Sequence, residues 1–164
     1  MLQRKYYFLI FILILSIVSV FIFYNTEKIQ QDTLASSLTQ KDSSVWVGNS
    51  VYQIPIDTEN GKLIYYGYEL IAHTAKYLGP KGSVQHSTNG MNCQNCHLEA
   101  GTKPWGINYG SVYSTYPKFR DRSGSIESIY KRVSDCMERS LNGSALDSNT
   151  KEMQAMIAYI KWVG

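Results

Sequence analysis

The motif Cys93-Gln94-Asn95-Cys96-His97 constrains this chain more than any of its other features. Two cysteines three positions apart share one turn and can bond the two vinyl groups of a haem, while the imidazole of the next residue reaches the iron. The surrounding residues 82–122 are rich in Gly, Ser, Asn and Pro, and so long a loop needs a ligand to organise it. The motif therefore predicts one covalently attached haem c, with His97 as an axial ligand.

Other uses of paired cysteines fit this motif less well. A zinc site needs four ligands, and the chain contains no second C-x-x-C and no H-x-x-x-H. A thioredoxin-like site would follow a strand in an α/β context, whereas the flanking residues here are polar loop. A disulfide between Cys93 and Cys96 is the remaining alternative to haem attachment.

An uncharged apolar run covers residues 6–24, and Arg4 and Lys5 precede it. At about 1.5 Å rise per residue, a helix of this length matches the core of a bilayer. The two cations predict a cytoplasmic N-terminus, and no small-residue cleavage site follows the run closely. We expect residues 1–26 to be an uncleaved single-pass anchor in the inner (cytoplasmic) membrane, with the rest on the periplasmic side.

The third cysteine, Cys136, has no partner once the haem has taken up Cys93 and Cys96. An odd cysteine in an oxidising compartment needs a reason, and we predict that its thiolate is the second axial ligand of the iron. A buried packing thiol and a bridge to another chain are the alternatives. Methionine is the usual distal ligand of electron-transfer cytochromes, so further candidates are Met91, Met137, Met153 and Met156.

The chain after the apolar run divides into a polar tether, residues 27–44, and a folded domain, residues 45–164. Asn60-Gly61 indicates a turn before a first helix at 63–79. A second helix is expected at 125–143 with Ser125 as its cap, and a third at 148–164. We predict an all-α, small cytochrome c-like domain of about three helices around one covalent haem, preceded by one N-terminal transmembrane helix.

The charge of the chain does not support nucleic-acid binding. The 16 Lys and Arg residues exceed the 13 Asp and Glu residues by three, and two of these cations precede the apolar run. The remainder is nearly neutral, and we predict no nucleic-acid partner.

Four segments resemble a known family: NGMNCQNCHLEAGT, YPKFRDRSG, RVSDCMERSLNG and KEMQAMIAYIKW. From about Ile54 onward the chain resembles the N-terminal, catalytic haem domain of the thiosulfate dehydrogenase family, and more distantly the A subunit of the periplasmic sulfur-oxidising complex. The combination of C-x-x-C-H with a downstream C-x-E-R-S-x-N-G is far more specific than C-x-x-C-H alone.

The resemblance implies that His97 and Cys136 hold the iron, and that two thiosulfates are coupled into tetrathionate with release of two electrons. It also matches Arg120, Arg122 and Ser140 to the family's substrate pocket. Paired guanidinium groups suit an oxyanion, although the same geometry also suits haem propionates. Ser140 follows Cys136 by one helical turn. The expected catalytic residues are therefore Cys136, Arg120, Arg122 and Ser140.

The resemblance also implies that the first and last helices cross near Gly67 and Tyr159. Enzymes of the family commonly carry a second haem domain, whereas this chain has one C-x-x-C-H. The expected partners are a small sulfur oxyanion and a separate electron-acceptor cytochrome or respiratory-chain component. The alternative function is a membrane-anchored monohaem cytochrome that only carries electrons.

Overall fold

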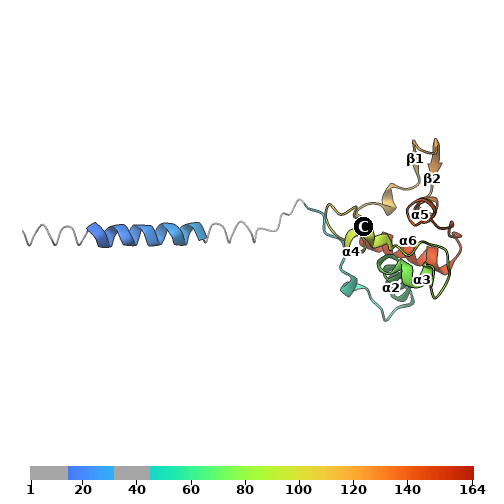
Figure 1. Cartoon of the computed structure of the whole chain (residues 1–164), viewed down its shortest axis with the longest axis horizontal. Helices are drawn as coiled ribbons and strands as arrows, with labels where there is room; N and C mark the ends of the chain where they lie inside the picture. The colour runs from blue at the N-terminus through green and yellow to red at the C-terminus, as the bar shows by residue number, and fades with distance from the viewer. Residues whose placement is uncertain (1–14, 32–44) are drawn as a thin grey trace, which may run out of the picture. The chain divides into compact units, whose positions relative to one another are not determined.

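The computed structural model describes residues 15–31 and 45–164 (Figure 1). Residues 15–31 are helical, and among the described residues no helix is both long and apolar enough to cross a membrane. The predicted span begins at residue 6, and residues 6–14 and most of the predicted tether lie outside the described residues. The anchor and the tether therefore stay predictions. Val45–Gly164 forms a compact unit that contains the haem motif.

Helices dominate this compact unit, as predicted. The longer helices are α2 (Glu59–Ala72), α5 (Ile129–Arg139) and α6 (Lys151–Val163), and the shorter ones are α3 (Thr74–Leu78) and α4 (Leu98–Gly101). Single turns of 3-10 helix occur at η1 (Val51–Gln53), η2 (Cys93–Asn95) and η3 (Tyr113–Thr115). Two short strands, β1 (Lys118–Arg120) and β2 (Ser125–Glu127), form an antiparallel hairpin.

Helices α2 and α6 cross closely at the centre of the core. A Cβ atom on Gly67 would overlap the carbonyl oxygen of Ala155 and would lie 2.8 Å from Cβ of Tyr159. Glycine therefore allows the two backbones to approach each other at this point. The predicted crossing near Gly67 and Tyr159 is confirmed.

The first predicted helix starts earlier than expected and is broken near its end. Thr58 caps α2 by accepting the backbone N–H of Gly61, so Asn60-Gly61 lies in the first helical turn and the predicted turn was wrong. At His73 the backbone leaves helical geometry, with φ −129° and ψ 43°, and α3 follows. The break leaves the first N–H groups of α3 without partners inside that helix.

The second predicted helix starts later than expected, because residues 125–127 pair with β1 instead. In the hairpin, Phe119 lies opposite Ile126. Ser128 caps α5 by accepting the N–H of Lys131, so the prediction of Ser125 as the cap was wrong. The hairpin was not predicted, and it projects beyond α5 (Figure 1).

Candidate haem site

The haem motif forms one tight turn. The N–H groups of Cys96 and His97 both donate to the carbonyl oxygen of Cys93, at 3.2 and 3.0 Å. The turn brings two free thiols to one wall of a cavity of about 250 Å³. In the described part of the chain, no group of three or more His, Cys, Asp or Glu side chains could hold a metal ion.

The break between α2 and α3 anchors this turn. Thr74 is fully buried, and its hydroxyl donates to the carbonyl of Leu70 at 2.7 Å and accepts the N–H of Cys93 at 2.9 Å. The side-chain oxygen of Asn92 accepts the N–H of Ala75 at 2.9 Å, in the first turn of α3. Hydrogen bonds therefore hold the chain at Cys93 and at the residue before it.

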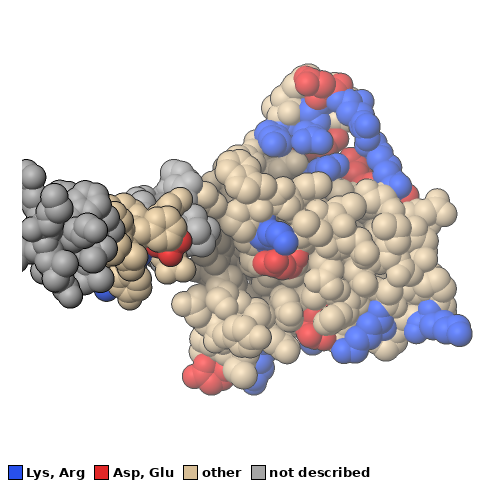
Figure 2. Space-filling model, turned by 60° about the vertical axis from the view of Figure 1, so that its left-hand side comes forward, with Lys and Arg blue, Asp and Glu red and all other residues tan. Residues whose placement is uncertain are grey.

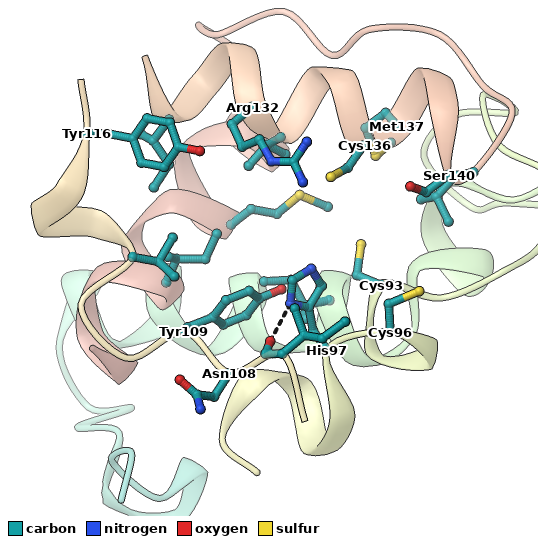
Figure 3. A pocket seen from close by; sticks show the side chains of 18 of the residues that line it. Cys93, Cys96, His97, Asn108, Tyr109, Tyr116, Arg132, Cys136, Met137 and Ser140 are labelled. Carbon is teal, nitrogen blue, oxygen red and sulfur yellow. Dashed lines mark hydrogen bonds between the residues drawn. The ribbon is translucent and has the colours of Figure 1, made fainter. Parts of the chain in front are cut away.

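A backbone hydrogen bond orients the ring of His97. Its Nδ1 lies 2.7 Å from the carbonyl oxygen of Ile107, so Nδ1 is the donor and Nε2 keeps a free lone pair (Figure 3). The ring of Tyr109 packs beside it, with 4.7 Å between centroids. Burial lowers the pKa of His97, and the charge of Arg132 acts in the same direction. A neutral imidazole held in this way is prepared to bind iron.

Helix α5 forms the opposite wall of the cavity. Arg132, Cys136 and Ser140 follow one another at four-residue intervals and line the cavity from one face of the helix. Figure 3 shows the Cys136 sulfur and the Arg132 guanidinium directed into the cavity, across from His97. Within the described residues, no hydrogen bond or ion pair occupies the Arg132 guanidinium or the Ser140 hydroxyl. Both groups are therefore available to a ligand.

The structure brings part of the predicted catalytic set together. Cys136 and Ser140 share the cavity wall, whereas Arg120 ends β1, Arg122 lies in the hairpin turn, and neither lines this cavity. Side chains two apart on a strand share a face, so Arg120 is on the same face of β1 as Lys118, which does line the cavity. Figure 2 shows Lys and Arg side chains gathered over the hairpin, with acidic side chains among them. The substrate roles of both arginines stay predictions.

Arg132 was not predicted as a site residue. Its spacing of four residues before Cys136 was the available signal, because positions i and i+4 share a helix face. Its guanidinium provides a positive charge on the same wall as the Cys136 thiol. A free cation and a free hydroxyl beside a thiol can bind an anion at this wall.

Of the four methionines considered as iron ligands, three line the cavity and one does not. Met137 and Met156 are buried and line the cavity, Met91 lines it at 42% exposure, and Met153 is buried outside its lining. Cys136 and Met137 are neighbours in the chain and both border the cavity. Ligation of the iron by Cys136 therefore stays a prediction.

The residues around the cavity fit a haem. Apolar side chains such as Ile71, Val112, Ile129 and Ile160 make up much of its lining, which suits the faces of a porphyrin. The two thiols of the motif line the cavity, where they could bond the vinyl groups of a haem. His97 and Cys136 lie on opposite walls of the same cavity. Burial raises the pKa of the Cys93 thiol, as expected for a sulfur enclosed by apolar groups.

Comparison with known proteins identifies the family. Residues 83–164, half of the chain, match the family described as SoxA/TsdA, cytochrome c domain. The chain belongs to this family. Its cofactor is covalently bound haem c, and the resemblance stated from the sequence is confirmed. Attachment through Cys93 and Cys96 stays a prediction.

The similar curated proteins are thiosulfate dehydrogenases. That of Psychrobacter arcticus is 36% identical over 107 residues, which make up 65% of this chain and 31% of that protein. That of Stutzerimonas stutzeri is 32% identical over 133 residues, 78% of this chain and 41% of that protein. The chain therefore spans less than half the length of these relatives.

A solved structure supports the fold. The thiosulfate dehydrogenase (TsdBA) of Marichromatium purpuratum matches with a TM-score of 0.66 and 22% identity. The match covers 74% of this chain and 26% of that one. It shows that the compact unit shares the architecture of a domain within that larger protein.

Proposed function

We propose that this domain oxidises thiosulfate, or a similar sulfur anion, and passes the electrons to a partner cytochrome. The relatives matched over 65% and 78% of the chain are named thiosulfate dehydrogenases. The observation that carries the proposal is the wall opposite His97, where Arg132, Cys136 and Ser140 lie together. A thiol, a cation and a hydroxyl side by side suit a sulfur-containing anion.

The proposed axial ligands are His97 and Cys136. The hydrogen bond to Ile107 already holds His97 in the tautomer that an iron ligand needs. Cys136 is a free thiol, and its thiolate would add negative charge and lower the haem potential relative to a methionine ligand. When bound, the haem would supply a one-electron acceptor for the reaction.

Arg132 and Ser140 position the substrate in this proposal. The planar guanidinium can donate to two oxyanion oxygens at once, and the hydroxyl of Ser140 can donate to a third. Lys118 adds positive charge at the same cavity. Arg120 and Arg122, on the neighbouring hairpin, attract the dianion toward the cavity.

The proposed reaction is a two-electron oxidation, and it balances with the partner cytochrome as the final electron acceptor. Two thiosulfate ions (S₂O₃²⁻) join through a new sulfur–sulfur bond to give tetrathionate (S₄O₆²⁻), and two electrons are released. Arg132 and Ser140 bind the oxygens of the anion, and its terminal sulfur points toward Cys136. The electrons leave one at a time, so the reaction needs two successive transfers to a partner cytochrome.

A separate part of the proposal concerns the N-terminal residues. The uncharged run at 6–24, preceded by Arg4 and Lys5, supports an anchor in the inner membrane. In this arrangement the compact unit is on the periplasmic side of that membrane. The haem would then lie where periplasmic sulfur anions reach it.

Anaerobic stopped-flow mixing of the oxidised holoprotein with thiosulfate tests the proposed reaction. Thiosulfate should reduce the haem, and ion chromatography should detect tetrathionate. Arg132→Gln should lower kcat/KM roughly 10- to 100-fold, because a charged contact is worth about 1.5–3 kcal/mol. The control Arg139→Gln removes a cation from the same helix outside the cavity and should change the rate little.

Two outcomes would contradict the proposal. If thiosulfate leaves the haem oxidised while small cytochromes exchange electrons with it, the domain is an electron carrier instead. If the two arginine variants lose activity equally, Arg132 has no special role in the cavity.

A further inference from the structure

The loop after the haem motif has unusual backbone geometry. Ala100, Trp105 and Ile107 have positive φ, at 53°, 62° and 52°. Left-handed backbone is strained for residues other than glycine, and it is least favourable for bulky and β-branched residues. Such strain persists only where the surrounding structure enforces it, and it clusters at functional sites.

Hydrogen bonds hold this loop in one shape. The N–H of Leu98 donates to the carbonyl of Gly106 at 3.0 Å, and the N–H of Gly106 donates to the carbonyl of Lys103 at 3.1 Å. The N–H of Tyr109 donates to the carbonyl of Gly101 at 2.8 Å. The loop therefore presents its side chains from a fixed, internally bonded backbone.

The outer side of the loop is apolar. Trp105 is 90% exposed, Ile107 is 64% exposed and Leu98 is 41% exposed. The Leu98 side chain packs against Gly106, the residue between Trp105 and Ile107, where a Cβ atom would come within 2.9 Å of Cβ of Leu98. We call Leu98, Trp105 and Ile107 the Trp105 surface. Trp105 itself adds almost nothing to the core.

The Trp105 surface is connected directly to the haem site. The carbonyl oxygen of Ile107 accepts the hydrogen bond from His97 Nδ1 at 2.7 Å, and Ile107 also lines the cavity. A molecule seated on this surface would contact the residue that orients the axial histidine. Electron transfer weakens steeply with distance, so this position favours exchange with a bound redox partner.

We propose that the Trp105 surface is the docking site of the electron-accepting partner, a haem protein that presents a small apolar surface at its own haem edge. The proposal rests on the proposed function in one respect, since it requires electrons to leave this domain. Docking on the proximal side leaves the wall with Arg132 and Cys136 free for substrate. Oxidation and electron release can then occur on different sides of the haem.

The size and charge of the Trp105 surface favour a transient partner. Three side chains offer a few hundred Å² of contact, below the roughly 800 Å² per partner of a stable complex, and redox encounters are among the smallest interfaces. This area is too small for a stable dimer with a second copy of the chain. The nearby charges compensate each other, because Lys103 pairs with Glu99 at 3.4 Å. The partner is therefore recognised by apolar contact rather than by charge.

The test uses holoprotein that has been reduced with dithionite. Stopped-flow mixing with a small soluble cytochrome c of higher potential measures docking and transfer, and mixing with ferricyanide measures transfer without docking. Trp105→Ala should lower the second-order rate constant for the cytochrome about tenfold and leave the ferricyanide rate unchanged. The loss should persist at about 0.5 M salt, which screens charges but not apolar contact, and Trp105→Tyr should restore most of the rate.

A matched control is Tyr52→Ala, which removes another aromatic side chain that is 95% exposed. Equal cytochrome rates in Trp105→Ala and Tyr52→Ala would overturn the proposal. A loss in Phe119→Ala in place of Trp105→Ala would put docking on the hairpin and would also overturn it. An equal loss with ferricyanide would do the same, because it would show a change in the haem site itself.

These outcomes are independent of the substrate. Dithionite supplies the electrons, so a protein that fails to oxidise thiosulfate still gives a result for the Trp105 surface. A protein that oxidises thiosulfate but transfers electrons equally well without Trp105 would contradict only the docking proposal.

Discussion

Thr74→Val should destabilise the domain, because it removes the hydroxyl that links the break between α2 and α3 to the haem motif. This hydroxyl donates to the carbonyl of Leu70 at 2.7 Å and accepts the N–H of Cys93 at 2.9 Å. Thr74 is fully buried, and valine has nearly the same shape. The substitution therefore changes hydrogen bonding and leaves the packed volume almost unchanged.

The expected magnitude follows from the group that loses its partner. A buried donor left without an acceptor costs about 1–3 kcal/mol, and Cys93 is half-buried, which favours the lower part of this range. A loss of about 1–2 kcal/mol should lower the Tm of a domain of this size by roughly 4–8 °C. The amide of Cys93 should also exchange its hydrogen with solvent faster, because its hydrogen bond is gone.

Thermal unfolding of the holoprotein and amide hydrogen exchange measure these two effects. Thr88→Val is the matched control, since it removes another buried threonine hydroxyl, which donates to the carbonyl of Leu78 at 3.0 Å. It should leave exchange at Cys93 unchanged. If Thr74→Val melts at the wild-type temperature and the Cys93 amide stays protected, the link between the helix break and the haem motif is refuted.

Three further predictions concern the fold around the site. Gly67→Ala should lower the free energy of unfolding by at least about 2 kcal/mol, because its Cβ would overlap the α6 backbone; an unchanged midpoint in guanidinium unfolding would refute the close crossing. Ser128→Ala should cost about 1 kcal/mol in the same assay, whereas Ser125→Ala should cost far less, because only Ser128 caps α5. Burial raises the pKa of Glu69, but hydrogen bonds from Tyr77 and a neighbouring lysine outweigh it, so the folded pKa lies below its ordinary value. The ionised Glu69 carboxylate therefore stabilises the folded domain above the unfolded pKa, and this contribution is lost as the pH falls through the folded pKa. Tyr77→Phe removes one of its hydrogen bonds, so it should destabilise the domain by about 1 kcal/mol at pH 7 and by less at about pH 3. Equal losses at both pH values would contradict that pairing.

The haem motif could be predicted because its chemistry depends on residues that are adjacent in the chain. Cys93, Cys96 and His97 need only one turn to stand on the same wall of the cavity. Cys136 could be singled out because it is the odd cysteine, and the structure places it across the cavity from His97. Its role as an iron ligand is still a prediction.

Features that depend on pairing between distant residues could not be predicted in the same way. Ser125 and Ser128 both resemble helix caps, and pairing of residues 125–127 with β1 decides between them. Arg120 and Arg122 belong to the same hairpin and do not line the cavity. The sequence match to the family's substrate pocket could not reveal this, because the position of the hairpin depends on strand pairing. Arg132 faces the cavity through helix periodicity, a local signal that was present but was not used.

Electron paramagnetic resonance of the oxidised holoprotein most directly tests whether His97 and Cys136 hold the haem iron between them. We predict a low-spin signal with thiolate coordination that disappears in Cys136→Ser and persists in Met137→Leu. A methionine-type signal in the wild-type protein, or a thiolate signal that survives Cys136→Ser, would contradict this assignment.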